Sequence, residues 1–322
     1  MIYDVFNGDA DGILSLVQLR KANPQESRLI TGVKRDIALV KNIDVDLATH
    51  VNVLDVSLEK NIDAVKQLID SQVSLFYADH HRSGDIPQSN LLQIHIDTHP
   101  NTCTALIIDE ILDGAYKSWA IAAAFGDNLN ERAFELATMA NLSRQQAEQL
   151  QELGVLINYN GYGATVEDLH YHPAELYRLL MAYDSPFDVI DDDSSPFHVL
   201  KSAYDDDIAR ARSEKPQHNS DILIVTELPN CAWARRVSGV FGNMLANESP
   251  NKAHAVLTQN LDSNTYTVSL RAPLKNKQGA GDVCASFATG GGRAAAAGIN
   301  ALPAIELTKF IEAVEEAYTS RL

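Results

Sequence analysis

LFYADHHRSG (residues 75–84) is the stretch of sequence that says most about this fold. An apolar, aromatic run ends here in a carboxylate, Asp79, which is followed by two adjacent histidines, His80 and His81. This pattern is typical of a buried strand whose carboxyl end delivers side chains into a crevice at the edge of a sheet. Neutral imidazole is the commonest side-chain ligand for a transition metal, and a nearby carboxylate can fix its tautomer. A His-His pair alone is a weak signal, because loop histidines are common, so its meaning depends on the other strand ends.

A second acidic turn lies at the N-terminus. MIYDVF (residues 1–6) reads as a strand, and NGDADG (residues 7–12), whose glycines allow a tight turn, leads into a helical pattern. Asp9 and Asp11 place two like charges in this turn, which is unfavourable unless a cation neutralises them. A helix cap would explain one of these aspartates but hardly both.

Two further apolar runs end in an aspartate. VNVLDVS (residues 51–57) alternates as a strand does and carries Asp55 at its end, and the run at residues 120–126 stops at a Gly-Asp turn with Asp127. In a parallel βαβ array the carboxyl ends of the strands lie on one edge of the sheet, so these side chains can converge there. Oxygen and imidazole ligands together suit Mn²⁺, Fe²⁺, Co²⁺ or Zn²⁺ better than Ca²⁺.

With these residues the sequence resembles the DHH family of phosphoesterases. That family includes RecJ-type single-strand exonucleases, nanoRNases, cyclic-dinucleotide phosphodiesterases and family II pyrophosphatases. The turn at residues 7–12, Asp55, the triplet at residues 79–81 and Asp127 match four of its motifs in order. The resemblance implies an α/β fold, in which an N-terminal parallel-sheet DHH domain with flanking helices is joined to a smaller C-terminal α/β domain. It also implies an active site in the cleft between the two domains.

The resemblance also implies roles for individual residues. Asp55 would bridge two metals, Mn²⁺ is the first choice of ion, and one or two ions are expected. His81 would contact the scissile phosphate or protonate the leaving oxygen, in a catalytic pair with Asp79, while a metal-activated water attacks. The metal ligands by this correspondence are Asp9, Asp11, Asp55, His80 and Asp127.

Two positions depart from the family pattern in the metal region. Asn7 stands where RecJ-type relatives usually have an aspartate, and Val5 stands where the nanoRNase and pyrophosphatase branches commonly have a histidine. One of the two metal sites therefore keeps Asp9 and the shared Asp55 but loses charge. Binding at this weaker site could then depend on oxygen atoms of the substrate.

The C-terminal region resembles the phosphate-binding domain of the nuclease branch. Its signature is GGGR at residues 290–293, with Arg293 where many relatives carry histidine, and VSLR at residues 268–271 fits upstream. Backbone amides of glycines can approach an anion closely, and arginine offers a fixed fork of donors. The alanine-rich run at residues 294–297 favours a helix, which would put the glycines at a positive helix N-terminus. The expected substrate-binding residues are Arg271, Gly291, Gly292 and Arg293.

Composition restricts the class of protein and of substrate. The 322 residues suffice for two domains, and we expect a catalytic domain at 1–190, a linker at 191–215 and a substrate-binding domain at 216–322. A net charge of −17 disfavours nonspecific binding of long duplex DNA and suits short or small phosphorylated substrates. The basic pair Lys34-Arg35 is expected to be a solvated surface pair more often than a phosphate contact. No apolar run approaches the length of a membrane span, no leader is evident, and the three cysteines are scattered, so a cytoplasmic protein with reduced, buried thiols is expected.

The leading functional prediction is a metal-dependent phosphodiesterase that hydrolyses short single-stranded oligonucleotides, as nanoRNases and exonucleases do. The alternatives are a phosphohydrolase of a small phosphorylated metabolite or cyclic dinucleotide, and a nucleotide-binding regulator with weakened catalysis. The sequence leaves open whether the substrate is RNA or DNA, which polarity cleavage has, and whether the chain forms a homodimer. Beyond the strands named above, the pattern predicts strands at 28–31, 92–96, 253–259 and 265–271, helices at 101–114, 132–154, 197–213, 237–246 and 305–321, and a loop at 157–163.

Overall fold

The computed structural model describes residues 1–261 and 264–319, which divide into two compact units, Met1–Ser202 and Ala203–Leu322. The first unit is built on a parallel five-stranded sheet in the order β2-β1-β3-β4-β5. Its strands are β1 (Ile2–Phe6), β2 (Arg28–Ile30), β3 (His50–Leu54), β4 (Ser74–Asp79) and β5 (Leu92–Ile96). Its helices are α1 (Ala10–Ala22), η1 (Val40–Asn42), α2 (Leu58–Asp70), α3 (Thr104–Ile111), α4 (Lys117–Gly126), α5 (Asn130–Met139), α6 (Arg144–Gly161), η2 (Val166–Asp168), α7 (Pro173–Met181) and α8 (Pro186–Asp191).

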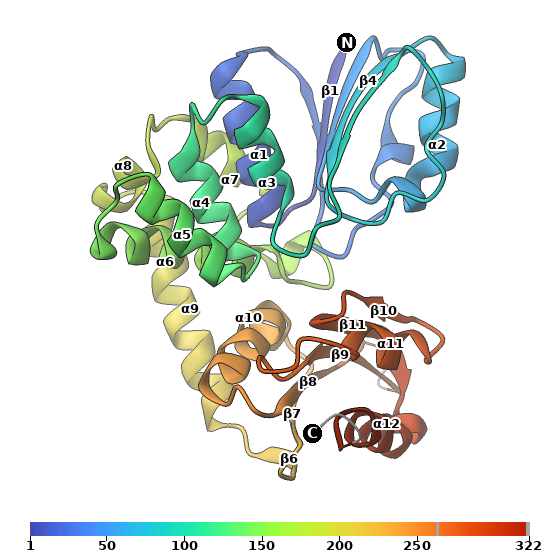
Figure 1. Ribbon diagram of the computed structural model, residues 1–322, viewed down its shortest axis with the longest axis vertical. Helices are drawn as coiled ribbons and strands as arrows, with labels where there is room; N and C mark the ends of the chain where they lie inside the picture. The colour runs from blue at the N-terminus through green and yellow to red at the C-terminus, as the bar shows by residue number, and fades with distance from the viewer. Residues whose placement is uncertain (262–263, 320–322) are drawn as a thin grey trace. The chain divides into compact units, whose positions relative to one another are not determined.

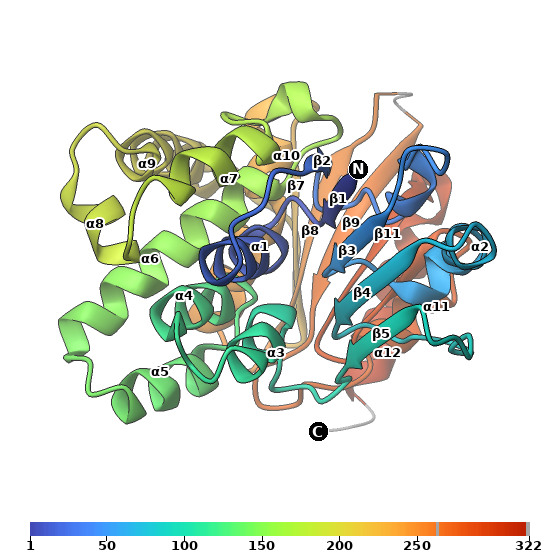
Figure 2. The ribbon, with the colours of Figure 1, turned by 90° about the horizontal axis from the view of Figure 1, so that it is seen from above.

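Helices cover both faces of this parallel sheet, as Figures 1 and 2 show for α2 on one side and α1 on the other. Tyr3 and Val5 of β1 point toward the face covered by α2 and belong to one buried cluster with Val65 and Leu68. The intervening residues point toward α1, and Phe6 meets Tyr177 of α7 with ring centroids 5.9 Å apart. Burial on both faces explains the nearly continuous apolar character of these strands.

The charged exception in β1 is Asp4, which is fully buried. Arg20 of α1 donates two hydrogen bonds to its carboxylate, at 2.8 and 2.5 Å, and Asn52 of β3 donates a third at 2.7 Å. A buried charge is tolerated only when it is paired and hydrogen-bonded in this way. The pair ties α1 to the centre of the sheet and so sets the position of the turn that precedes α1.

The order of the strands creates a switch point beside β1. The chain leaves β1 for β2 on one side and places β3 on the other side. In open α/β sheets, ligands bind outside the carboxyl ends of the strands at such a point. The turn after β1 and the residues that follow β3 and β4 therefore lie where a site is expected.

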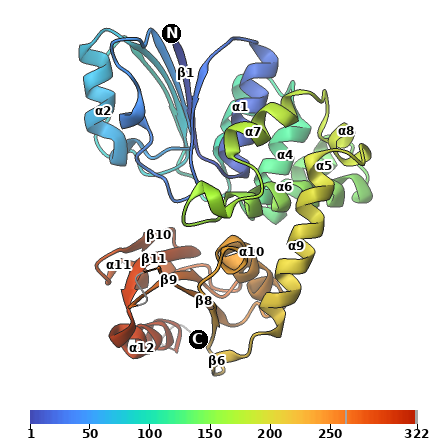
Figure 3. The same ribbon diagram turned by 180° about the vertical axis from the view of Figure 1, so that it is seen from behind.

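The second unit carries a mixed six-stranded sheet in the order β10-β11-β9-β8-β7-β6, in which only β7 and β8 run parallel. Phe310 and Val314 of α12 pack on one face with the buried core of the sheet, and α10 covers the other, where Gly242 approaches Val256 (Figure 3). The helix α9 (Pro196–Ser213) leads from one unit into the other. The remaining elements are β6 (Pro216–Asn219), β7 (Leu223–Leu228), α10 (Ala232–Glu248), β8 (Ala253–Gln259), β9 (Thr265–Arg271), α11 (Ala280–Ala285), β10 (Gly290–Gly292), β11 (Ala296–Pro303), η3 (Ala304–Glu306) and α12 (Leu307–Thr319).

Most predicted elements are present, and two predictions were wrong. The strands at 92–96, 253–259 and 265–271 have the predicted bounds, and the helix expected at 305–321 is α12, with the last two expected residues outside the described part of the chain. The expected loop at 157–163 is wrong, because α6 continues to Gly161. The helix expected after Arg293 is also wrong, because residues 296–303 form β11. The apolar run before Asp127 is the helix α4.

The cysteines have no disulfide partner among the described residues. Cys103 and Cys284 are buried, as expected, whereas Cys231 is half-buried. Across residues 1–261 and 264–319, no helix combines the length and the apolar character that a membrane crossing requires.

Candidate metal centre and phosphate-binding residues

The turn after β1 depends on two glycines that leave no room for a side chain. A Cβ on Gly8 would lie 1.9 Å from the carbonyl oxygen of Gly32, and a Cβ on Gly12 would lie 2.2 Å from that of Asn7. Asp9 caps α1, because its Oδ1 accepts a hydrogen bond from the backbone N–H of Gly12 at 3.1 Å. The close backbone approach therefore holds the Asp9 carboxylate at the end of β1.

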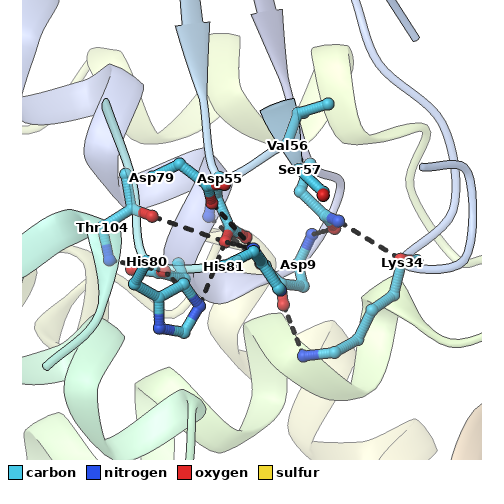
Figure 4. A network of polar contacts seen from close by, with 12 residues as sticks. Asp9, Lys34, Asp55, Val56, Ser57, Asp79, His80, His81 and Thr104 are labelled. Atoms are coloured by element: carbon cyan, nitrogen blue, oxygen red, sulfur yellow. Dashed lines mark hydrogen bonds and ion pairs between the residues drawn. The ribbon is translucent and has the colours of Figure 1, made fainter. Parts of the chain in front are cut away.

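Asp55 follows β3 in a left-handed backbone conformation, with φ of +57°. Its backbone N–H donates to the carbonyl of Ala78 in β4 at 3.1 Å, and only 2% of the residue is exposed. A non-glycine residue in this conformation is uncommon and persists only where its surroundings determine it. The turn of the backbone directs the Asp55 carboxylate toward the histidines after β4 (Figure 4).

His80 lies directly against the Asp55 carboxylate. Its Nε2 is 3.4 Å from Asp55 Oδ1 and 3.7 Å from Asp11 Oδ2. Its Nδ1 lies 3.1 Å from the carbonyl oxygen of Thr102, which can only accept, so Nδ1 carries the proton. Nε2 therefore faces the acidic cluster, where it would be available to a metal ion. This is how an outer hydrogen bond prepares a histidine to bind a metal.

His81 is paired with Asp79, the last residue of β4. Its Nδ1 is 2.7 Å from Asp79 Oδ1 and 3.7 Å from Asp55 Oδ1. Asp79 is fully buried, and its other oxygen, Oδ2, has no hydrogen-bond partner among residues 1–261 and 264–319. Burial alone would lower the pKa of His81, but the hydrogen bond with Asp79 and the charge of Asp55 outweigh it, so the pKa is raised. The arrangement orients His81 and favours its protonated form.

Asp11 joins the cluster to α3. Its two oxygens accept hydrogen bonds from the backbone N–H groups of Thr104 and Ala105, at 2.8 and 2.7 Å. The hydroxyl of Thr104 donates to Asp55 Oδ1 at 3.4 Å. The first turn of α3 thus offers its unsatisfied N–H groups to the carboxylates. The sequence predicted this helix but not the part that Thr104 has in the site.

The carboxylates lie close together, and this contributes to raised pKa values for Asp55 and Asp11. Burial raises the pKa of Asp55 well above its ordinary value, and the charges of Asp9 and Asp11 raise it further. Burial also raises the pKa of Asp11, where His80 acts in the opposite direction and Asp127 adds to the rise. Asp127 is half-buried at the C-terminal end of α4 and contributes its charge from there. A cation placed among these groups would relieve the repulsion.

Lys34 supplies one such cation, although the sequence favoured a solvated position for it. Its Nζ donates to Asp9 Oδ2 (Figure 4), and it also donates to Asn158 Oδ1 at 3.0 Å. The Lys34 side chain is only 24% exposed. Burial alone would lower the pKa of Lys34, but Asp9 raises it above the ordinary value, so the group is an ammonium. The expectation of a solvated surface pair is wrong for this residue, because the partner lies 25 residues away in the chain.

The structure brings some of the predicted residues of the first unit together. Among the described histidines, cysteines and acids, Asp55, His80 and His81 form a group whose candidate ligand atoms lie within 4.8 Å of one another. Asp11 lies beside His80, whereas Asp9 is turned toward Lys34. Sequence reasoning missed the partners that hold these groups, namely Thr102, Thr104 and Asn158.

The four predicted phosphate contacts lie in the second unit. The guanidinium of Arg271 already donates to Asn243, Ser269, Leu270 and Gly239, which occupies four of its five N–H groups. Gly290, Gly291 and Gly292 form the strand β10 at the edge of the sheet, paired with β11, so they do not precede a helix. A Cβ on Gly291 would meet nothing within 4 Å, which leaves its backbone open to approach.

Comparison with known proteins gives a match in fold. No family model matches the chain, and no curated protein matches its sequence. Among solved structures, a DHH domain described as a member of the s1p family of ribosomal proteins is 14% identical, with a TM-score of 0.64, over 98% of this chain and 85% of that chain. RecJ from Thermus thermophilus, in complex with Mn²⁺, is 17% identical, with a TM-score of 0.61, over 100% of this chain and 52% of RecJ. The pGpG-specific phosphodiesterase PggH from Vibrio cholerae is 13% identical, with a TM-score of 0.58, over 99% of both chains. These likenesses show that the chain has the fold of DHH-domain proteins.

Proposed function

We propose that this chain is a DHH-family phosphoesterase, a hydrolase that cleaves phosphodiester bonds with the help of a divalent metal ion. The observation that carries the proposal is the convergence of Asp55, His80 and His81 at the carboxyl ends of β3 and β4. The fold supports it, because structural neighbours of this chain include RecJ bound to Mn²⁺ and a pGpG-specific phosphodiesterase.

The donor set fits a divalent transition metal. The buried carboxylate of Asp55 and the Nε2 atom of His80 lie 3.4 Å apart. The hydrogen bond from His80 to Thr102 provides the outer support that metal-binding histidines usually have. Asp55 and His80 would hold the ion, with Asp11 and Asp127 adding negative charge around it. Mn²⁺ suits such mixed oxygen and nitrogen ligands.

The residues around this position suit hydrolysis of a phosphate ester. When bound, the metal would supply Lewis acidity and lower the pKa of a water molecule toward neutrality. His81, held by Asp79, would protonate the leaving oxygen, and the hydrogen bond with Asp79, which raises the pKa of His81, favours the protonated ring. Asp79 acts through His81 and is therefore a positioning residue.

Short oligonucleotides are the substrate class that the charge supports best. A chain with a net charge of −17 has no general attraction for long nucleic acids, so binding must come from a few local contacts. Arg293, the half-buried Gly291 and the exposed Gly292 in the second unit would contact a phosphate of the substrate. A small phosphorylated metabolite or a cyclic dinucleotide would need the same contacts and is the alternative within the same chemistry.

A nucleotide-binding regulator with weakened catalysis is the second candidate function. Asn7 has no charge, Val5 is buried in the sheet core, and Asp9 is paired with Lys34. These features reduce the set of metal ligands in the first motif. The regulator would bind nucleotide without turning it over at any metal concentration.

One experiment separates these functions. Purified protein with Mn²⁺ is incubated with end-labelled RNA and DNA oligonucleotides, cyclic dinucleotides and a chromogenic phosphodiester. His80→Ala is the test variant, and His218→Ala, a histidine of the second unit, is the matched control. Turnover that is lost in His80→Ala and kept in His218→Ala would establish the phosphodiesterase. Silence across the panel with nucleotide still bound would favour the regulator, and turnover that survives His80→Ala would contradict the proposed site.

A further inference from the structure

The acidic cluster contains a positive charge that belongs to the protein itself. The Lys34 ammonium donates to Asp9 and to Asn158, and it lies 5.5 Å from the centre of the Tyr162 ring. The Asp9 side chain is only 4% exposed. This is a largely desolvated ion pair with a second polar partner and an aromatic face, which is more than a surface contact provides.

The backbone of Lys34 is fixed on both sides, so the side chain starts from a defined position. Its N–H donates to the carbonyl of Gly161 at 2.8 Å, and its carbonyl accepts from the Asn7 side chain at 3.2 Å. Gly161 is the last residue of α6, and Asn158, one turn earlier in that helix, accepts from the ammonium. Two elements far apart in the sequence thus hold Lys34 against the turn after β1.

In the turn after β1, the side-chain oxygens that could bind a metal already accept hydrogen bonds. Asp9 Oδ1 accepts from Gly12, and Asp9 Oδ2 accepts from Lys34. Asn7 Oδ1 accepts from the N–H of Asp9 at 3.2 Å, and its side-chain nitrogen donates to Lys34. Val5 lies in the buried cluster on the α2 face of the sheet. Both carboxylate oxygens of Asp9 and the side-chain amide of Asn7 therefore already have partners in the protein.

We propose that Lys34 is a built-in cation that takes the place of one divalent ion, so that the centre binds a single metal ion at Asp55 and His80. This inference rests on the metal centre of the proposed function. A metal ion at Asp9 would have to displace the Lys34 ammonium or sit beside a like charge, and either is unfavourable in a buried site. At the position proposed for the metal ion, Nε2 of His80 faces Asp55, and no lysine or arginine is paired with either residue in the described part of the chain.

Metal stoichiometry tests this directly, without reference to turnover. The full chain is titrated with Mn²⁺, following heat by calorimetry and free ion by electron paramagnetic resonance. Wild type should bind one Mn²⁺ per chain. Lys34→Met, which keeps the length of the side chain but removes its charge, should allow a second, weaker Mn²⁺ at Asp9. Lys41→Met, which removes an exposed lysine of η1, is the matched control and should stay at one.

A second variant keeps the test decisive if Lys34→Met does not fold. Asparagine is as good a helix cap as aspartate, so Asp9→Asn keeps the cap of α1 while removing the charge. Because Asp9 faces Lys34 and not the metal, Asp9→Asn should still bind one Mn²⁺, with an affinity within about tenfold of wild type, since larger losses are expected even of residues that only support a metal ligand.

The contradicting outcomes are distinct from each other. Two Mn²⁺ ions in wild type, a single ion in folded Lys34→Met, or loss of binding in Asp9→Asn would overturn the proposal for Lys34. These results would leave the phosphodiesterase itself in place. No Mn²⁺ binding at all in wild type would overturn the metal centre, and with it the proposed function.

Discussion

Asp55 combines two features that are unfavourable on their own, a left-handed backbone and a buried carboxylate. Its neighbours hold it in place, through the N–H bond to Ala78 and the hydroxyl of Thr104. Natural proteins keep such residues where function needs them and accept the loss of stability. At the scale of single residues, a substitution in this site should therefore raise the stability of the fold and weaken metal binding.

Asp55→Asn should show this exchange. Asparagine tolerates the left-handed conformation, so the change removes the charge and keeps the backbone. Since burial raises the pKa of Asp55, the ionised group destabilises the metal-free fold, and its removal should raise the Tm. A gain of about 1 kcal/mol corresponds to about 2–4 °C for a domain of this size. Calorimetry in EDTA measures the Tm, and Mn²⁺ titration should show binding reduced by more than about 100-fold. An unchanged Mn²⁺ affinity would remove Asp55 from the metal ligands.

Asp79→Asn tests whether the partner of His81 acts by orientation. An amide that donates to Nδ1 opposes protonation of the ring, and the carboxylate charge that favours the imidazolium is lost, so His81 would lose its role as an acid. We expect kcat to fall by about 10²-fold or more, with Mn²⁺ affinity little changed, because general acid catalysis contributes about 10²–10⁴-fold. Asp79→Asn and His81→Ala should not be additive in the double variant. Fully additive losses would mean that Asp79 acts independently of His81.

At the scale of elements, the sequence predicted the ends of the strands in the first unit better than the secondary structure near the C-terminus of the second unit. The apolar runs of β1, β3 and β4 end in or are followed by acidic residues, and convergence of their ends follows from the topology alone. Residues 294–297 are alanine-rich and favour a helix locally, yet Ala297 and Gly298 pair with Leu270 and Ser269 of β9. Tertiary pairing overrides local preference there.

Lys34 could not have been placed from the sequence for a related reason. Its partners are Asp9 in the turn after β1 and Asn158 in α6, which lie 25 and 124 residues away along the chain. No local pattern reports such a contact. The same holds for Thr102 and Thr104, whose contacts with His80 and Asp55 depend on where α3 begins.

The edge strand β10 offers a matched pair of glycine variants. A Cβ on Gly290 would lie 1.8 Å from the carbonyl oxygen of Cys284, whereas a Cβ on Gly291 would meet nothing within 4 Å. Gly290→Ala should therefore destabilise the second unit by about 1–3 kcal/mol through overpacking. Gly291→Ala should change stability by no more than about 0.5 kcal/mol. Denaturant unfolding, followed by the fluorescence of Trp233 in a Trp119→Phe background, measures both.

Gly291→Ala also tests whether β10 contacts the substrate. If the Gly291 backbone contacts a phosphate, the added methyl group should raise KM for an oligonucleotide with kcat nearly unchanged. Mn²⁺ binding should not change, because the metal residues lie in the first unit. A normal KM in folded Gly291→Ala would remove β10 from the phosphate contacts.

At the scale of the whole molecule, charge limits the way a nucleic acid can be held. The chain has 43 acidic side chains against 26 lysines and arginines, and some of the basic groups are already committed. Lys34 is paired with Asp9, Arg20 with Asp4, and Arg271 uses four of its N–H groups inside its own domain. If the chain hydrolyses oligonucleotides as proposed, we therefore expect affinity to come from the metal centre and a small number of phosphate contacts.

The salt dependence of catalysis should report the number of phosphate contacts. For single-stranded nucleic acids, the logarithm of affinity falls with the logarithm of salt concentration by about 0.7 for each phosphate contact. With two contacts or fewer, log(kcat/KM) for a short oligonucleotide should fall with a slope no steeper than about −1.4. Arg293→Ala should make the slope shallower by about 0.7, because one contact is lost. Arg144→Ala, which removes an exposed arginine paired with Glu148 on α6, should leave it unchanged. A slope of about −3 or steeper in wild type would mean that an extended basic surface binds the strand, and an unchanged slope in Arg293→Ala would show that Arg293 does not contact phosphate.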